Sequence, residues 1–163
     1  MLKKILFFLL IVLVVIQFFH PKKNTATGAQ PHSIQTAFAI PPDVRIILEK
    51  ACNDCHTNNT RYPWYSRVQP VDWWLDNHVR DGKKHLNLDE YTSRSLRYQY
   101  HKLEEIAEQT KSGEMPLNSY TWMHTDAKLT AAEKDLLINW ADKMRDSMRA
   151  LYPLDSLERR KNP

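Results

Sequence analysis

The stretch Cys52-Asn53-Asp54-Cys55-His56 decides how the rest of the chain is interpreted, because it holds the only two cysteines among 163 residues. A Cys-x-x-Cys pair followed at once by histidine is the attachment pattern of a c-type haem. Residues three apart on a helical turn share a face, so both sulfurs can reach the two vinyl groups on one porphyrin edge. The imidazole of His56 then lies where it can bind the iron as the proximal ligand. The pattern predicts one covalently attached haem c, held by Cys52, Cys55 and His56.

Three other uses of the two cysteines fit the sequence less well. A disulfide across two residues is strained, and so short a loop restricts the unfolded chain little. A thioredoxin-like redox pair belongs in a βαβ setting, whereas the surrounding sequence has helical periodicity. A zinc site needs more ligands than this motif and its neighbourhood supply.

The first twenty residues form an export or anchoring segment. Lys3 and Lys4 precede an apolar run over residues 5–19 that only Gln17 interrupts. The run is intermediate in length between a signal peptide and a full membrane span. We expect residues 1–20 to stay attached as a signal anchor, with the lysines in the cytoplasm and the rest of the chain in the periplasm. Cleavage as a signal peptide, near residues 26–29, is the alternative.

The charge distribution argues against a nucleic-acid partner. The formal net charge of +4 is carried entirely by four lysines in the first forty residues, namely Lys3, Lys4, Lys22 and Lys23. The remainder is formally neutral and gives no basic face for phosphate binding. Residues 21–40 are mostly polar and lack an apolar period, so we predict a flexible tether there, followed by a domain over residues 41–152.

The pattern of apolar residues predicts helices on both sides of the motif. One helix begins at Asp43 and runs into the motif. Residues 57–69 are predicted to be an aromatic loop, and a second helix follows Pro70 and ends or kinks at Asp81-Gly82. The apolar stripe of this second helix consists of Val71, Trp74, Leu75, His78 and Val79.

Two further helices complete an all-α domain. The third begins at Asp89 or Thr92 and ends near Gly113, a residue that suits a helix C-terminus. After a loop over residues 114–129, Thr130 and Glu133 have the spacing of a capping box that starts the last helix. Residues 153–163 are predicted to be a frayed tail.

The sixth iron ligand has two candidates. Met115 lies in Gly113-Glu114-Met115-Pro116, where the glycine allows close approach and the proline stiffens the chain. A thioether favours ferrous iron and raises the reduction potential. Met115 could equally be a hydrophobic plug, and His78, on the inner stripe of its helix, is the alternative ligand.

The chain from Cys52 to Trp140 resembles a class I cytochrome c and, more closely, the bacterial haem-binding domain family of single-haem envelope proteins. The segments that carry the resemblance are CNDCHTNN (52–59), YPWYS (62–66), PVDWW (70–74), GKKHLN (82–87) and GEMP (113–116), with Ser119-Tyr120, His124 and Leu129-Thr130. The resemblance implies a cytochrome c-like helical fold, haem attachment at Cys52, Cys55 and His56, and Met115 as the distal ligand. It implies no particular redox partner.

These observations favour a membrane-tethered mono-haem c-type cytochrome that transfers single electrons in the periplasm. The haem would supply the redox chemistry and the protein its ligation and burial. A haem-based sensor or ligand-binding module, with an open or labile sixth site, is the alternative. We do not expect an enzyme such as a peroxidase, because Met115 would fill the open iron face that such chemistry requires.

Overall fold

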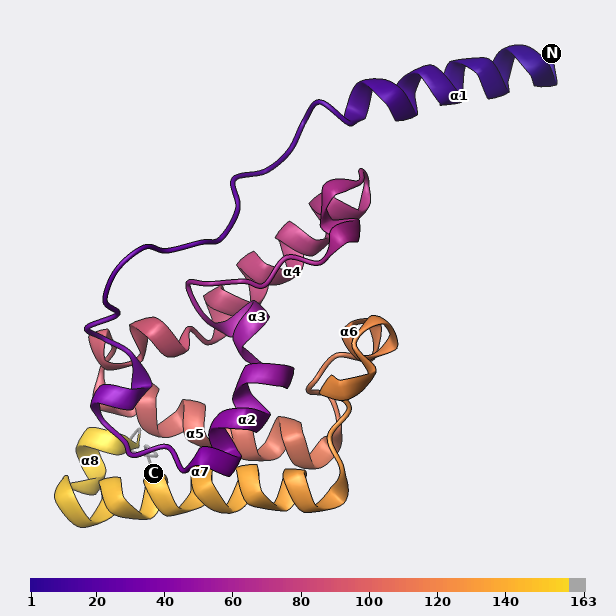
Figure 1. The fold of residues 1–163 in the computed structure, drawn as a ribbon. Helices are drawn as coiled ribbons and strands as arrows, with labels where there is room; N and C mark the ends of the chain where they lie inside the picture. Colours follow the sequence, from indigo (N-terminus) through magenta and orange to yellow (C-terminus); the bar gives the residue numbers. More distant parts are fainter. Residues whose placement is uncertain (159–163) are drawn as a thin grey trace, which may run out of the picture.

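Two long helices, α5 (Leu96–Ser112) and α7 (Ala131–Leu151), lie side by side and form the base of the fold (Figure 1). Helix α2 (Pro42–Ala51) packs on α7, and α8 (Leu154–Leu157) packs on α5. The computed structural model describes residues 1–158, and its secondary structure there is helical apart from one isolated bridge between Thr25 and Asn59. The all-α prediction is confirmed.

The ends of α5 and α7 follow from their sequences. The Ser95 hydroxyl accepts a hydrogen bond from the Tyr98 amide at the start of α5, and Gly113 ends that helix with a left-handed φ of 79°. Thr130 and Glu133 form the predicted capping box at the start of α7. Each device satisfies backbone groups that a helix end leaves without partners. The core between these helices contains Tyr100, Leu103, Leu137, Trp140, Ala141 and Met148.

The short helix α3 (Asn53–His56) follows α2 and packs against α4 (Val71–His85). The prediction that this second helix ends or kinks at Asp81-Gly82 is wrong, because α4 continues to His85. Gly82 serves a different purpose. A Cβ atom there would lie 2.7 Å from the Cys55 carbonyl oxygen, so the absence of a side chain lets α3 and α4 approach each other.

Short helices occupy segments that were expected to be irregular. Residues 57–69 contain η2 (Trp64–Arg67), and residues 114–129 contain α6 (Asn118–Met123) and η4 (Thr125–Ala127). The third predicted helix is split, since η3 (Leu88–Ser93) precedes α5. The predicted frayed tail is wrong for α8, because its Leu157 is buried in the core. The last part of that predicted tail, 159–163, lies outside the described residues.

Helix α1 (Leu2–Ile16) extends away from the rest of the chain and buries none of its residues (Figure 1). Within residues 1–158, no helix combines the length and the apolar character required to cross a membrane.

The segment after α1 differs from the predicted flexible tether. It contains η1 (Ile34–Thr36), whose Ile34 is buried in the core, and it packs against the domain along much of its length. Asn24 bonds through its side-chain amide to the Thr57 carbonyl and the Thr60 hydroxyl, both 2.9 Å away. The polar residues that suggested disorder are therefore the hydrogen-bonding groups that hold the segment in place.

Asp72 is the strongest attachment point for this segment. Its side chain is only 1% exposed, and its two oxygens contact Lys23 Nζ at 2.6 Å and His20 Nδ1 at 2.7 Å. A buried carboxylate needs such partners, because removal from water without them costs several kcal/mol. The structured part of the chain thus begins well before residue 41.

Candidate haem site

A cavity of about 530 Å³ lies between α3, α4, α5 and the segment that leads into α6. This volume is within the range of about 300–1,000 Å³ that small-molecule and cofactor pockets occupy. Much of its wall is apolar, with contributions from Leu48, Leu86, Ile106, Leu117 and Leu137. Cys52, Cys55, His56, His78 and Met115 all line the same cavity, so the structure brings every residue predicted for the site together.

The two cysteines are free thiols on the wall of the cavity. Burial raises the pKa of Cys52 to about 12 and that of Cys55 to about 11. Both sulfurs therefore keep their protons at neutral pH. No group of three or more His, Cys, Asp or Glu side chains suited to a metal ion occurs in the described part of the chain.

The orientation of His56 suits an iron ligand. Its Nδ1 lies 2.9 Å from the Leu86 carbonyl oxygen. A carbonyl can only accept, so Nδ1 carries the proton and Nε2 keeps the lone pair that binds a metal. Burial lowers the pKa of His56, which keeps the imidazole neutral. The carbonyl that fixes this tautomer comes from Leu86, the residue directly after α4, and no local sequence pattern indicates this contact.

Met115 reaches the cavity from the loop that follows α5. The left-handed turn at Gly113 reverses the chain, and the Met115 amide donates a 3.1 Å hydrogen bond to the Gln109 carbonyl. These contacts hold the loop against the end of α5 with the Met115 side chain half-buried on the cavity wall.

His78 lines the cavity from α4 and is half-buried. Its Nδ1 donates to the Trp74 carbonyl at 2.8 Å, and the two rings lie 4.2 Å apart. This hydrogen bond leaves Nε2 as the nitrogen available to a metal. The choice between Met115 and His78 remains a prediction.

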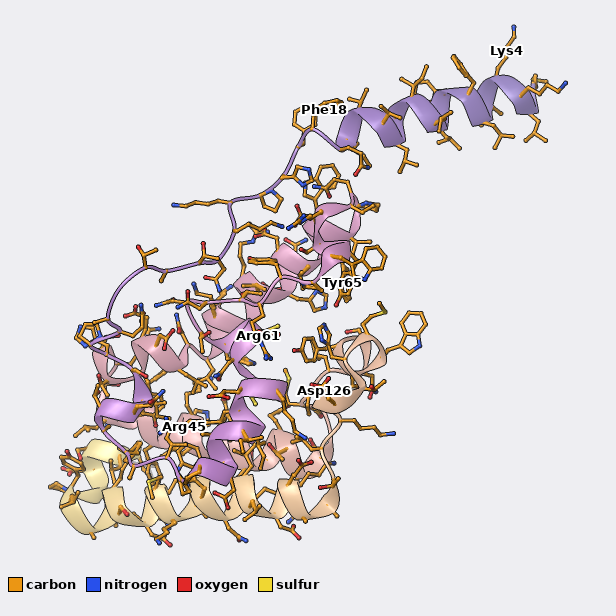
Figure 2. The ribbon with its side chains drawn as sticks, viewed as in Figure 1. Lys4, Phe18, Arg45, Arg61, Tyr65 and Asp126 are labelled. Atoms are coloured by element: carbon orange, nitrogen blue, oxygen red, sulfur yellow. The ribbon has the colours of Figure 1, made fainter. Side chains whose placement is uncertain are left out.

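Asp54, between the two cysteines, organises the surroundings of the motif and was missed by the sequence reasoning. Its carboxylate is buried and accepts hydrogen bonds from the Arg61 amide and Nε, both at 3.1 Å. Tyr120 donates to its other oxygen at 2.8 Å. Burial and the bond to Asp54 raise the pKa of Tyr120, so the phenol stays protonated as a donor. Arg61 lies beside α3 in Figure 2.

His124 extends these contacts to η2. Its ring stacks on Tyr120 with centroids 4.4 Å apart, and its Nε2 lies 2.7 Å from the Tyr65 hydroxyl. Figure 2 shows Tyr65 on the side of η2 that faces α6. The motif, α6 and η2 are thus joined by polar contacts between residues up to 66 positions apart, which no local sequence pattern could reveal.

One cationic side chain on the wall of the cavity is buried. Lys102 on α5 is about nine-tenths buried, lines the cavity and forms an ion pair with Glu105. A carboxylate of a bound ligand, such as a haem propionate, could bind this ammonium group.

Comparison with known proteins agrees with the composition of this site. The family model described as a haem-binding domain matches residues 11–143, and the chain therefore belongs to that family. The match includes the segment after α1, in keeping with its packing on the domain. Searches of curated proteins and of solved structures found no match.

Proposed function

We propose that this member of the haem-binding domain family is a membrane-tethered mono-haem c-type cytochrome that transfers single electrons in the periplasm. The observation that carries the proposal is the hydrogen bond from His56 Nδ1 to the Leu86 carbonyl. It presents Nε2 as a ligand in a cavity that both thiols of the Cys52–Cys55 pair also line. A c-type site requires this combination of one oriented imidazole and two reduced thiols.

Each protein group has a defined role in the proposed site. The thiols of Cys52 and Cys55 can each add across a vinyl group, with sulfur bonding one carbon and the hydrogen going to the other, so no oxidant is needed. His56 would hold the iron through Nε2, because the Leu86 carbonyl orients its ring. When bound, the haem supplies one-electron iron chemistry, while the apolar walls exclude water and set the reduction potential.

Met115 is the proposed sixth ligand, with His78 as the alternative. A filled sixth site suits electron transfer and leaves no position for a substrate at the iron, so we propose that the chain is not an enzyme. One observation favours the second candidate function, a haem-based sensor. Both possible ligands line the same cavity, so an external ligand could displace one of them.

The absorption spectrum of the purified holoprotein, with and without carbon monoxide, tests this choice. An electron carrier with Met115 on the iron is expected to show an unchanged reduced spectrum under carbon monoxide. The Met115→Ala variant is the matched control and should bind the gas. Rapid binding by the native protein would contradict the electron-carrier proposal and support the sensor.

The proposed tether consists of α1 and the aromatic residues that follow it. The apolar side chains of α1 are exposed from Leu2 to Val15, and Lys3 and Lys4 lie at its far end. The contacts of the next segment support retention of this tether. Cleavage near residues 26–29 would remove both His20 and Lys23, leaving the buried carboxylate of Asp72 without its two hydrogen-bonding partners.

Alkaline carbonate extraction of native membranes, followed by N-terminal sequencing, tests the tether. We expect the protein to stay in the membrane pellet and to begin within the first residues of the chain. Release into the supernatant with a start near Ala29 would contradict the tether without affecting the haem site.

A further inference from the structure

Four of the five tryptophans are at the surface, which is unusual for so large an apolar side chain. Trp140 is buried in the core, whereas Trp64 is 77% exposed and Trp122 is 82% exposed. Clustered exposed apolar side chains mark surfaces that contact a partner or a membrane. The position of these tryptophans relative to α1 favours a membrane over a protein partner.

Trp64 and Trp122 belong to segments that are joined to each other. Trp64 lies in η2 and Trp122 in α6, and the contact between Tyr65 and His124 connects the two segments. Figure 1 shows that α1 leaves the domain on the side where η2 and α6 protrude. The segments that carry these two exposed tryptophans therefore lie on the side of the domain from which α1 extends.

The junction between α1 and the domain is fixed by hydrogen bonds. The Gln69 amide donates to the Gln17 side chain at 2.9 Å, and the Gln69 side chain donates to the Phe19 carbonyl at 2.6 Å. Trp73 Nε1 donates to the same carbonyl at 2.9 Å. With these bonds in place, the start of α4 must lie at the same depth in a lipid bilayer as the end of α1.

The length of α1 determines that depth. Its 15 residues extend about 22 Å, less than the hydrocarbon core of about 30 Å. If Lys3 and Lys4 reach toward the far headgroups, the end of α1 and the exposed Phe18 are drawn into the near side of the bilayer. Figure 2 shows Phe18 at the bend between α1 and the domain.

We propose that the side of the domain next to α1 rests in the interfacial layer of a lipid bilayer. This surface, which we call the apolar platform, consists of Phe18, Phe19, Trp64, Val68, Trp73 and Trp122. The inference rests on the proposed tether and adds a second contact with lipid. Indole rings suit this layer because they have an apolar body and a polar N–H group. Lys22 and Arg67 are exposed, lie close in sequence to Phe19 and Val68, and can pair with lipid phosphates.

The apolar platform would hold the haem cavity at the membrane surface in one orientation. Asp54 contacts Tyr120, and the Tyr120–His124–Tyr65 contacts continue to η2, so the platform and the haem motif are joined through side chains. A redox partner within the same membrane would then meet the same side of the domain at every encounter.

Fluorine NMR of the full-length holoprotein labelled with fluorotryptophan tests the proposal. The reduced protein is reconstituted into phosphatidylcholine vesicles containing some phosphatidylglycerol, under carbon monoxide so that the iron is diamagnetic whichever ligand it carries. Single Trp→Phe variants assign the signals. A spin-labelled lipid and a water-soluble paramagnetic agent report proximity to the bilayer and to water, and the buried Trp140 is the internal control.

We expect the spin-labelled lipid to abolish the Trp64 and Trp122 signals while the soluble agent leaves them intact. If the protein sediments with the vesicles but both signals respond only to the soluble agent, the platform is wrong and the tether stands. If neither agent affects them, a second copy of the chain covers these residues, and the platform is again wrong. Failure to sediment with the vesicles would contradict the tether and the platform together.

Discussion

Replacement of Gly82 by alanine perturbs the contact between the haem motif and α4 most directly. The new Cβ atom would lie 2.7 Å from the Cys55 carbonyl oxygen and 3.0 Å from Cys55 Cβ, whereas ordinary contact begins near 3.4 Å. The helices α3 and α4 must therefore separate by about 0.7 Å. Overpacking of this kind costs about 1–3 kcal/mol, and the better helix propensity of alanine returns about 1 kcal/mol. Because the clash involves backbone, which cannot rotate away, we expect a net loss of about 1–2 kcal/mol.

The assay combines guanidinium unfolding, followed by circular dichroism, with the amount of covalent haem per chain. Gly82→Ala is expected to lower both the free energy of unfolding and the haem content, because the displaced atoms belong to Cys55, one of the two cysteines proposed to attach the haem. Gly28→Ala is the matched control, because Gly28 has a φ of 106° and a new Cβ there would have no atom within 4 Å apart from those of the adjacent residues. Its strain of about 1–2 kcal/mol should leave haem attachment unchanged. A Gly82→Ala protein with full stability and full haem content would refute the close approach of α3 and α4.

Three further predictions concern the sixth ligand, the N-terminal segment and the response to acid. Met115→Ala should abolish the near-infrared charge-transfer band of sulfur-bound ferric haem and lower the reduction potential. His78→Ala should leave the spectrum unchanged and cost only about 1 kcal/mol of stability. If His78→Ala changes the spectrum and Met115→Ala does not, the iron has two histidine ligands. Lys23→Met should destabilise the protein by about 1–2 kcal/mol, because it removes one cation from the buried Asp72 carboxylate. Adding Asp72→Asn to this variant should restore most of the lost stability. Simple additivity of the two substitutions in the double-mutant cycle would argue against the contact. The pKa of Glu133 is lowered by its lysine partner and by the capping contacts, so its contribution is present above about pH 4.5 and is lost as the pH falls below that value. Glu133→Gln should still cap α7 but show a flatter loss of stability in acid titrations, and an unchanged acid profile would contradict this assignment.

The local patterns in the sequence predicted the parts of the fold that depend on neighbouring residues. The Cys52–His56 motif follows a helix as expected, the capping box at Thr130 starts α7, and Gly113 ends α5. Each of these features is determined within a few residues, so a pattern suffices to identify it.

The features that the sequence did not reveal depend on contacts between distant residues. Residues 21–40 are mostly polar and were expected to be flexible, but Asn24 forms hydrogen bonds with Thr57 and Thr60. Gly82 resembled a helix terminus because its role as a spacer is defined by Cys55, on another helix. Polar composition alone therefore does not distinguish a free segment from one whose partners lie elsewhere in the chain.

The measurement that tests the central claim most directly is the intact mass of the native protein after extraction with acidified acetone. The account predicts that the red colour stays with the protein and that the mass exceeds that of the chain by one haem, because Cys52 and Cys55 both form thioether bonds. Replacing both cysteines by alanine should make the haem extractable while His56 still binds it. Native protein that loses its haem to the solvent, or that carries none when prepared from the cell envelope, would contradict the account.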